Sequence, residues 1–293
     1  MGKRGKHTKN RNIRKKRKLH YNEQIINSKK RKLENDLKEN ISKDKKNSKV
    51  KNIFSNLFLI IFIICIFISV YEIIDWTINN KKTSEIRSSI ENVVTINNDE
   101  TIGESEKYNV DFEKLKGINS NTIGWLKVHG TDVEYPVVQG KDNSFYLNHS
   151  FDKKYNPAGW IFADYNNQFD EKMDKNTVIY GHNRRDGSMF CTLKNILKPE
   201  WYENEENKKI IFITENEKII YETFSVYEIE EELYYVTTDF SSETKYQKFI
   251  DTVKSRSIVD FGVEINTDDE ILTLSTCANN NKYRVVLHAK RIK

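Results

Sequence analysis

The chain has 293 residues, 37% of them hydrophobic and 31% charged, a composition that suits one sizeable soluble domain with appendages. Its formal charge of +5 averages two unlike parts, because residues 1–51 hold 20 Lys and Arg against 5 Asp and Glu whereas residues 52–293 carry a net −10. The three cysteines, at positions 65, 191 and 277, form no CxxC pair and no even framework, which argues against a structural zinc site and a disulfide scaffold.

The basic segment 1–51 has two interpretations. Its clusters of Lys and Arg, such as residues 14–18, are of a kind that neutralises nucleic-acid phosphates. They are equally typical of a solvated, largely disordered tail beside a membrane, and the apolar run that follows favours this second interpretation. We therefore expect a cytoplasmic tail that binds no nucleic acid.

Residues 52–75 predict a single transmembrane helix. The 22 residues from Ile53 to Ile74 are almost all Ile, Leu, Phe and Val with no polar face, and a membrane crossing takes about 20 residues. A cleaved signal peptide is the competing interpretation, but the charged region before this run is too long for one and no small-residue cleavage site follows. Because excess Lys and Arg marks the cytoplasmic side, we expect a single-pass cell-membrane protein with its C-terminal part outside the cell.

Residues 76–108 predict an extracellular stalk. They are rich in Asn, Ser, Thr and Glu and show little periodicity, although Ile86, Ile90, Val93 and Val94 would suit a short helix. We interpret the segment mainly as a spacer that holds the following domain away from the membrane.

Residues 109–293 predict a mostly β domain. Its apolar runs are short, rich in β-branched and aromatic residues and bounded by turn residues, which is typical of a barrel or sandwich. The expected strands are residues 124–128, 133–138, 177–180, 210–213, 219–227, 271–274 and 284–288. Two helical insertions are expected at residues 188–197 and 245–254, and Ser241 or Ser242 is placed to cap the second.

Cys277 is the candidate nucleophile. It follows the apolar strand 271–274, which the polar Ser275 and Thr276 bring to an end, and Arg284 opens the next apolar run. If the two strands pair, the thiol and the guanidinium lie at one edge of the sheet, where a fixed positive charge favours the thiolate. A buried structural thiol is the alternative for this cysteine.

His182 is the candidate proton carrier, because it directly follows the expected strand 177–180. One histidine at a strand end is a weak signal, and His288, within the last expected strand, could face either side of the sheet. A histidine, a cysteine and an arginine that converge would supply a proton carrier, a nucleophile and a stabilising charge.

Together these residues resemble the signature of the sortases. The signature consists of Thr273-Leu274-Ser275-Thr276-Cys277, the downstream Arg284 and the upstream Gly181-His182. Across residues 110–293 the chain resembles more narrowly the class B sortases, through the ordered stretches 124–125, 132–140, 142–143, 146–147, 159–162, 176–183, 186–190 and 284–286.

The resemblance implies an eight-stranded sortase β-barrel, with the helix at 245–254 as the class B insertion between late strands. It implies transpeptidation without a metal or another cofactor. The Cys277 thiolate would attack the peptide bond after Thr in the C-terminal sorting signal of a secreted protein, and an amine of a cell-wall peptide or peptidoglycan precursor would resolve the thioacyl intermediate. His182 would act as general acid and base, and Arg284 would hold the substrate or steady the oxyanion.

The resemblance also assigns a substrate groove to Asn143, Leu147, Tyr235, Val236 and Ser275. The chain departs from the class in the short link of six residues between the cysteine and the arginine, and in the alanine that follows the cysteine. Two other functions stay open: a pilus-polymerising sortase that uses a lysine of another protein, and a catalytically silent surface-binding protein on the same scaffold. A papain-type protease is disfavoured, because in that class the nucleophile precedes the histidine.

Overall fold

The computed structural model describes residues 5–97, 104–169, 173–230, 232–278 and 282–293, with the side chains of 5–18, 91, 104–105, 277 and 278 left out. The chain divides into two units, residues 1–74 and residues 75–293. The helix α1, Gly5–Glu91, runs through the first unit, and its last turns belong to the second.

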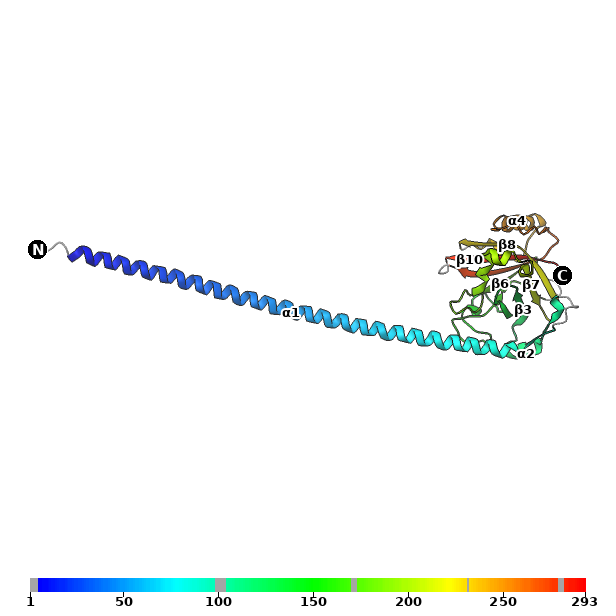
Figure 1. The fold of residues 1–293 in the computed structure, drawn as a ribbon, viewed down its shortest axis with the longest axis horizontal. Helices are drawn as coiled ribbons and strands as arrows, with labels where there is room; N and C mark the ends of the chain where they lie inside the picture. Colours follow the sequence, from blue (N-terminus) through cyan, green and yellow to red (C-terminus); the bar gives the residue numbers. More distant parts are fainter. Residues whose placement is uncertain (1–4, 98–103, 170–172, 231, 279–281) are drawn as a thin grey trace. The chain divides into compact units, whose positions relative to one another are not determined.

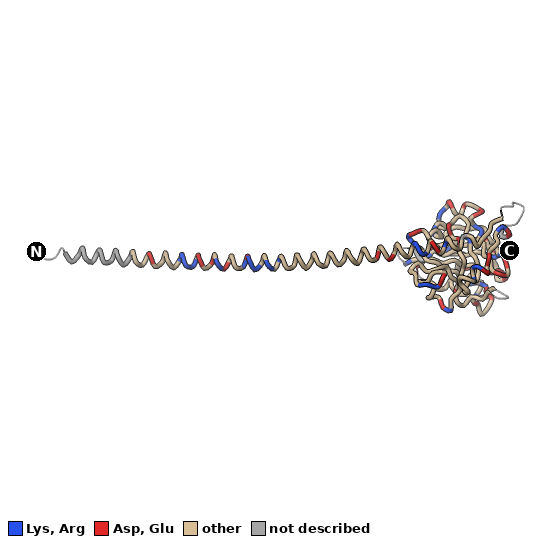
Figure 2. Tube along the Cα trace, turned by 90° about the horizontal axis from the view of Figure 1, so that it is seen from below, with Lys and Arg blue, Asp and Glu red and all other residues tan. Residues whose placement is uncertain are grey.

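The first unit is helical throughout its described part, residues 5–74. The prediction of a largely disordered tail is wrong for residues 5–51, because no Gly or Pro occurs between Lys6 and Ile102 and the segment is rich in the good helix formers Lys, Arg, Glu and Leu. Figure 2 shows Lys and Arg along the basic segment, followed by an uncharged run.

The uncharged run of α1 exposes large apolar side chains, with Phe58 73% and Phe67 70% exposed. Among the described residues, α1 is the one helix long and apolar enough to cross a membrane, judged by its length and composition. It is therefore a candidate membrane span, as the sequence predicts.

The second unit is built around a closed barrel of eight strands (Figure 1). Around the barrel the strands follow the order β10, β8, β7, β3, β4, β5, β6, β9. Their bounds are β3 Thr122–Val128, β4 Glu134–Gln139, β5 Phe162–Ala163, β6 Asn176–Gly181, β7 Lys209–Ile213, β8 Lys218–Glu230, β9 Ile271–Ala278 and β10 Tyr283–Arg291. The pairs β4–β5 and β6–β9 are parallel and the other pairs are antiparallel, so the predicted eight-stranded barrel is confirmed.

Seven of the eight barrel strands lie where the sequence predicts them. The exception is β5, whose two residues are too few to show a periodic pattern. Strand β9 also continues to Ala278 instead of ending before Ser275, so Cys277 belongs to the strand itself.

The remaining elements are short. The strands β1, Val94–Ile96, and β2, Tyr108–Val110, form a two-stranded sheet. The helices are α2 Phe112–Ile118, α3 Pro199–Tyr202 and α4 Glu243–Ser255, and the 3-10 helices are η1 Glu104–Lys107, η2 Phe145–Leu147, η3 Cys191–Leu197, η4 Glu205–Lys208 and η5 Tyr234–Val236. The helix predicted at 245–254 is thus confirmed as α4, and the Ser242 side chain caps it by accepting from the backbone N–H of Lys245. The other predicted helix, at 188–197, is the 3-10 helix η3.

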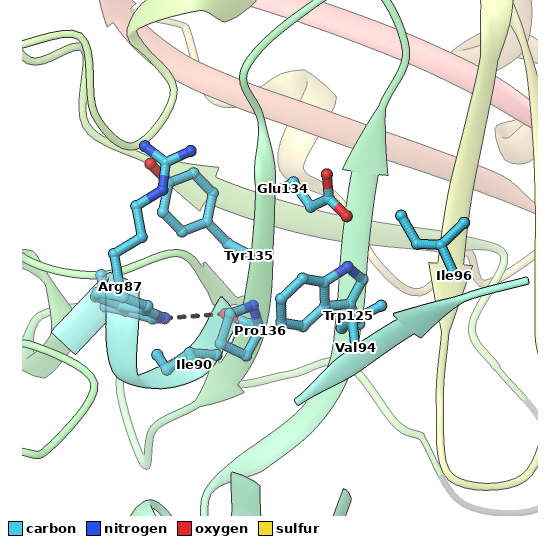
Figure 3. A pocket seen from close by; sticks show the side chains of 9 residues that line it. Arg87, Ile90, Val94, Ile96, Trp125, Glu134, Tyr135 and Pro136 are labelled. Carbon is cyan, nitrogen blue, oxygen red and sulfur yellow. Dashed lines mark hydrogen bonds between the residues drawn. The ribbon is translucent and has the colours of Figure 1, made fainter. Parts of the chain in front are cut away.

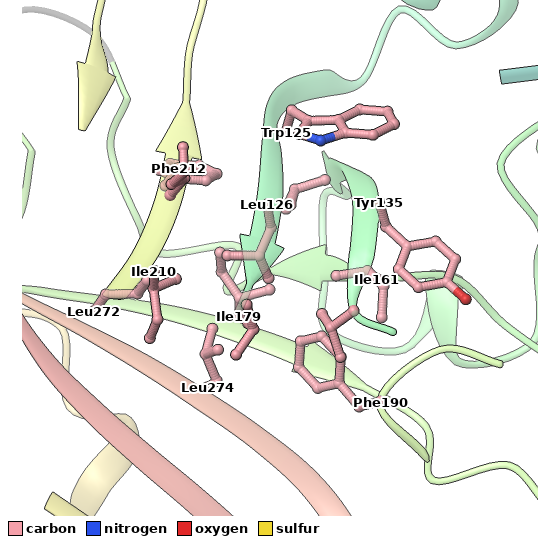
Figure 4. Close-up of a cluster of buried hydrophobic side chains, with 14 of the residues drawn as sticks. Trp125, Leu126, Tyr135, Ile161, Ile179, Phe190, Ile210, Phe212, Leu272 and Leu274 are labelled. Atoms are coloured by element: carbon pink, nitrogen blue, oxygen red, sulfur yellow. The ribbon is translucent and has the colours of Figure 1, made fainter. Parts of the chain in front are cut away.

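The barrel interior is filled by aliphatic and aromatic side chains from all sides (Figure 4). Leu126, Ile179, Ile210 and Leu274 are completely buried. Each such side chain contributes about 1.5–3 kcal/mol through its removal from water. A second apolar cluster joins α4 to the strands β8 and β10, so the inserted helix is fixed to the wall of the barrel.

The end of α1 packs on the barrel domain within the second unit. Asn156 Nδ2 donates to Thr83 Oγ1 at 3.0 Å, Arg184 Nη2 donates to Asn80 Oδ1 at 2.5 Å, and Ile90 is 2% exposed. Part of the segment expected as a stalk is therefore helical and in contact with the domain. The four-part division of the chain at residues 51, 75 and 108 stays a prediction.

Candidate active site

Three neighbouring strands bring the predicted catalytic residues to one end of the barrel. Strand β9 lies between β6 and β10, and the antiparallel register of β9 and β10 places Cys277 opposite Arg284. In the parallel pair of β6 and β9, Gly181 is opposite Thr276, so His182 and Cys277 each follow directly after this pair. The strand register therefore places the backbones of His182, Cys277 and Arg284 side by side, while the cysteine's side chain lies outside the described part of the structure.

A groove of about 440 Å³ opens at this end of the barrel. Seven of the eight predicted site residues line it: Asn143, Leu147, His182, Tyr235, Val236, Ser275 and Arg284. Sequence reasoning missed several other lining residues, among them Asp164, Tyr180 and Leu233. The structure thus gathers the predicted residues around one cavity, and their roles stay predictions.

The ring of His182 is held from one side by a backbone carbonyl. Its Nε2 lies 2.7 Å from Leu147 O, and because a carbonyl oxygen can only accept, Nε2 carries the hydrogen of this bond. This hydrogen bond fixes the ring at the groove and leaves Nδ1 as the nitrogen that can exchange a proton.

Gly159 allows the histidine and its carbonyl partner to approach each other. Its φ is +61°, and a Cβ at this position would lie 2.6 Å from Tyr146 O, 2.8 Å from Leu147 O and 2.9 Å from His182 Cδ2. Glycine tolerates both the left-handed conformation and the crowding. A glycine between Ala158 and Trp160 is therefore required by the packing of the site.

Asp164 organises one wall of the groove. It is 3% exposed, and its Oδ2 accepts from Asn143 Nδ2 and from the Tyr180 hydroxyl, both at 2.8 Å. Its Oδ1 accepts from the backbone N–H and from Nδ2 of Asn166, both at 2.9 Å. Burial, and then the nearby Asp164 carboxylate, raise the pKa of Tyr180, so this hydroxyl stays protonated and donates. Since Asn143 Oδ1 also accepts from the backbone N–H of Tyr165 at 3.0 Å, the Asn143 amide has a fixed orientation.

The opposite wall is formed by the turn η5 and the end of β9. The Tyr235 hydroxyl lies 3.1 Å from Ser275 Oγ, so this hydrogen bond joins the turn to strand β9. Leu233, just before the turn, is 73% exposed at the rim of the groove. The groove therefore combines polar groups on the Asn143 side with a partly apolar wall on the Val236 side.

A second cavity, of about 260 Å³, lies between the end of α1, strand β1 and strands β3 and β4 (Figure 3). It is lined by Arg87, Ile90, Val94, Ile96, Trp125, Glu134, Tyr135, Pro136 and Trp160. Strands β3 and β4 lie across the barrel order from β9 and β10. Among the described residues, its lining holds neither cysteine nor histidine. Within the described ranges of the chain, no group of three or more His, Cys, Asp or Glu side chains is arranged to hold a metal ion.

Comparison with known proteins agrees with this geometry. The family model of the sortase domain matches residues 126–292. The chain belongs to the sortase family. Sortase B of Staphylococcus aureus (strain NCTC 8325 / PS 47) is 38% identical over 185 residues, which cover 62% of this chain and 75% of that protein. Sortase B of Listeria monocytogenes serovar 1/2a is 35% identical over 185 residues, or 62% of this chain and 74% of that protein.

A solved structure extends the similarity to the fold. The Staphylococcus aureus sortase B–substrate complex has a TM-score of 0.58 at 37% identity, and the match covers 62% of this chain and 85% of that one. The class B resemblance predicted from the ordered stretches of sequence is thus confirmed. As a sortase of this class, the chain is a transpeptidase.

Proposed function

We propose that this sortase cleaves a C-terminal sorting signal after its threonine through a Cys277 thioacyl intermediate, and transfers the protein to a cell-wall peptide amine. The observation that carries the proposal is the register of β6, β9 and β10, which brings His182, Cys277 and Arg284 to one end of a groove. A sequence span of more than 100 residues separates the histidine from the arginine, so their meeting is a property of the fold.

In the first step, the Cys277 thiolate attacks the carbonyl carbon of the threonine. The C–N bond breaks, and His182 gives a proton to the leaving amine from Nδ1, because Nε2 is engaged with Leu147 O. The Arg284 guanidinium stabilises the negative charge that develops on the carbonyl oxygen, or holds the neighbouring peptide carbonyl. The product is a thioester between threonine and Cys277.

In the second step, the acceptor amine attacks the thioester carbonyl. His182 removes a proton from the amine, a new amide bond forms, and the sulfur leaves as a thiolate. Neither step needs a metal ion or a redox partner, because the bond energy of the first amide is conserved in the thioester.

The groove suits a short, extended peptide. Asn143 presents an amide whose orientation Asp164 fixes, and Leu147 and Val236 offer apolar contact on either side. Tyr235 and Ser275, linked by their hydroxyl groups, join the η5 wall to the strand β9. This arrangement would select a signal with both polar and apolar side chains next to the threonine.

We further propose that residues 52–75 anchor the enzyme in the cell membrane, with residues 1–51 in the cytoplasm and the catalytic domain, residues 109–293, outside. The apolar helix with exposed side chains and the basic segment before it support this topology. The substrates would then be secreted proteins that carry sorting signals, met at the outer face of the membrane.

The test uses the full chain in detergent with a threonine-containing sorting peptide and an amine acceptor. Cys277→Ala should abolish peptide cleavage, whereas the matched variant Cys191→Ala should keep it, because Cys191 is 9% exposed and does not line the groove. Mass spectrometry of the products distinguishes the amide formed with the acceptor from hydrolysis. Cleavage that persists in Cys277→Ala would refute the proposal.

The same assay separates the two alternatives. A pilus-polymerising enzyme would prefer a lysine of a pilin subunit over the wall-peptide amine when both are present. A catalytically silent protein would cleave nothing, and a thiol-reactive peptide analogue would not modify Cys277 selectively.

A further inference from the structure

His288 is completely buried in β10, four residues after Arg284, and the transpeptidation steps do not use it. Burial lowers its pKa to about 3, so the ring is neutral at physiological pH. Each ring nitrogen has a partner: Nε2 lies 2.8 Å from the Tyr227 hydroxyl and Nδ1 lies 2.8 Å from Thr273 Oγ1. A neutral histidine with two partners has one donor and one acceptor nitrogen, and the neighbouring groups decide which is which.

The hydroxyl of Tyr234 sets the direction of these hydrogen bonds. It donates to the Tyr227 hydroxyl at 2.9 Å, and burial raises the pKa of both tyrosines, so each keeps its proton. Because Tyr227 accepts from Tyr234, its own hydrogen is directed to His288 Nε2. The ring hydrogen of His288 is therefore on Nδ1, from which it is donated to Thr273.

The chain of hydrogen bonds then returns to the segment where it began. Thr273 Oγ1 donates to Asn176 Oδ1 at 2.6 Å, and Asn176 Nδ2 donates to Tyr235 O at 3.1 Å and to Thr237 O at 2.9 Å. Every hydrogen bond in this series is donated in the same direction, and the series ends on the segment of the chain in which it starts. We call the series, formed by Tyr234, Tyr227, His288, Thr273 and Asn176, the circuit. The circuit leaves the side chain of Tyr234, crosses β8, β10, β9 and β6, and ends on the backbone of η5 and the residue after it.

We propose that this circuit, with neutral His288 at its centre, is a positioning device for the η5 wall of the substrate groove. Tyr235 and Val236 line the groove, and both ends of the circuit hold the turn that carries them. A change to any member would leave the catalytic residues in place and loosen the wall that binds the peptide. The inference rests on the proposed function, because it assigns these residues to the binding of the same sorting peptide.

The circuit is tested with Tyr227→Phe, which removes one hydroxyl, and therefore two links, while the buried ring stays. The matched control is Tyr221→Phe on the same strand, since Tyr221 is also buried and its hydroxyl contacts Met173 Sδ at 3.9 Å, outside the circuit. We expect Tyr227→Phe to raise KM for the sorting peptide about tenfold with kcat within about threefold, because each lost hydrogen bond weakens the hold on the wall severalfold. In Tyr227→Phe, iodoacetamide should alkylate Cys277 at the wild-type rate. The control Tyr221→Phe should have the wild-type KM, kcat and alkylation rate.

Amide hydrogen exchange supplies a readout that does not depend on turnover. In Tyr227→Phe the amides of residues 233–237 should exchange about tenfold faster, while those of β3 and β4 keep the wild-type rate. Unchanged exchange rates of the amides of residues 233–237 would overturn the inference. A uniform rise of the exchange rates over the whole barrel, with equal losses in kcat and in the rate of Cys277 alkylation, would also overturn it. If the wild type itself fails to cleave the peptide, the proposed function fails, and hydrogen exchange still decides whether the circuit holds the wall.

Discussion

Gly159→Ala tests the packing that positions His182, the proposed proton carrier. The added methyl group would meet Tyr146 O at 2.6 Å, Leu147 O at 2.8 Å and His182 Cδ2 at 2.9 Å. Two of these atoms are backbone oxygens in the turn that binds the histidine, so the crowding moves the imidazole, its carbonyl partner or both. The change therefore affects His182, the group that we propose transfers the proton.

The expected loss in the free energy of unfolding has two contributions. An alanine at φ +61° costs about 1–2 kcal/mol for the left-handed conformation, and overpacking against fixed atoms adds about 1–3 kcal/mol. A displacement of about 1 Å at a catalytic group lowers the rate about a hundredfold. We therefore expect Gly159→Ala to lose about 2–5 kcal/mol in the free energy of unfolding and about a hundredfold in kcat/KM.

Gly262→Ala is the matched control, because Gly262 has φ +70° and a Cβ there would meet nothing within 4 Å. It should cost about 1–2 kcal/mol and leave kcat/KM within about twofold of the wild type. The assays are urea unfolding and cleavage of a fluorogenic sorting peptide, at a temperature where both variants are folded. Equal kcat/KM in the two folded variants would show that Gly159 does not position His182.

Three further predictions concern the groove wall, the buried histidine and the membrane helix. Asp164→Asn should raise KM for the peptide about tenfold with little change in kcat, because the charged acceptor that orients Asn143 is lost; equal effects on kcat and KM would contradict this role. His288 has a folded pKa of about 3 against a usual 6.5, so the unfolded state binds the proton first and stability falls as pH drops from 6.5 towards 3. Urea unfolding at pH 6.5 and 4.5 should therefore show a loss in the free energy of unfolding that is about 2 kcal/mol larger in the wild type than in His288→Gln, and equal losses would contradict the buried neutral state. Deletion of residues 1–75 should release the protein from sedimented membranes, whereas the full chain should stay with them, and a deletion variant that still sediments would contradict the anchor.

The strands around the proposed catalytic end of the barrel could be predicted from the sequence because their signals are local. The strands β6, β9 and β10 each contain a short apolar run with polar residues at its ends. Such runs predict both the strands and the positions of His182, Cys277 and Arg284 beside them. The groove residues Asn143, Leu147, Tyr235, Val236 and Ser275 came from resemblance alone, and the structure places all five around the cavity.

The parts that the sequence did not predict depend on distant partners. Asp164 looks like an ordinary loop residue, and its importance arises from Asn143 and Tyr180, which lie 21 and 16 residues away. His288 could have faced either side of its strand, and only the packing of β10 between β8 and β9 beneath α4 buries it. Its two partners, Tyr227 and Thr273, come from the neighbouring strands β8 and β9, so no local sequence pattern predicts these hydrogen bonds.

For the basic segment, residues 5–51, the prediction of disorder was wrong. Its charge suggested a chain without regular structure, but the absence of Gly and Pro and the many good helix formers favour a helix from Gly5 onwards. The charge of the segment supports only the prediction that it lies on the cytoplasmic side of the membrane, whereas its residue propensities favour the helix.

The most direct test of the account is mass spectrometry of the enzyme trapped during turnover. Wild-type chain mixed with a sorting peptide, quenched in acid and digested, should carry the peptide's threonine-terminated fragment as a thioester on Cys277, and an added wall-peptide amine should remove the adduct. His182→Ala should accumulate far less adduct in the same time. An adduct on Cys191, or peptide cleavage with no adduct on any cysteine, would contradict the claim that the end of β9 carries the nucleophile.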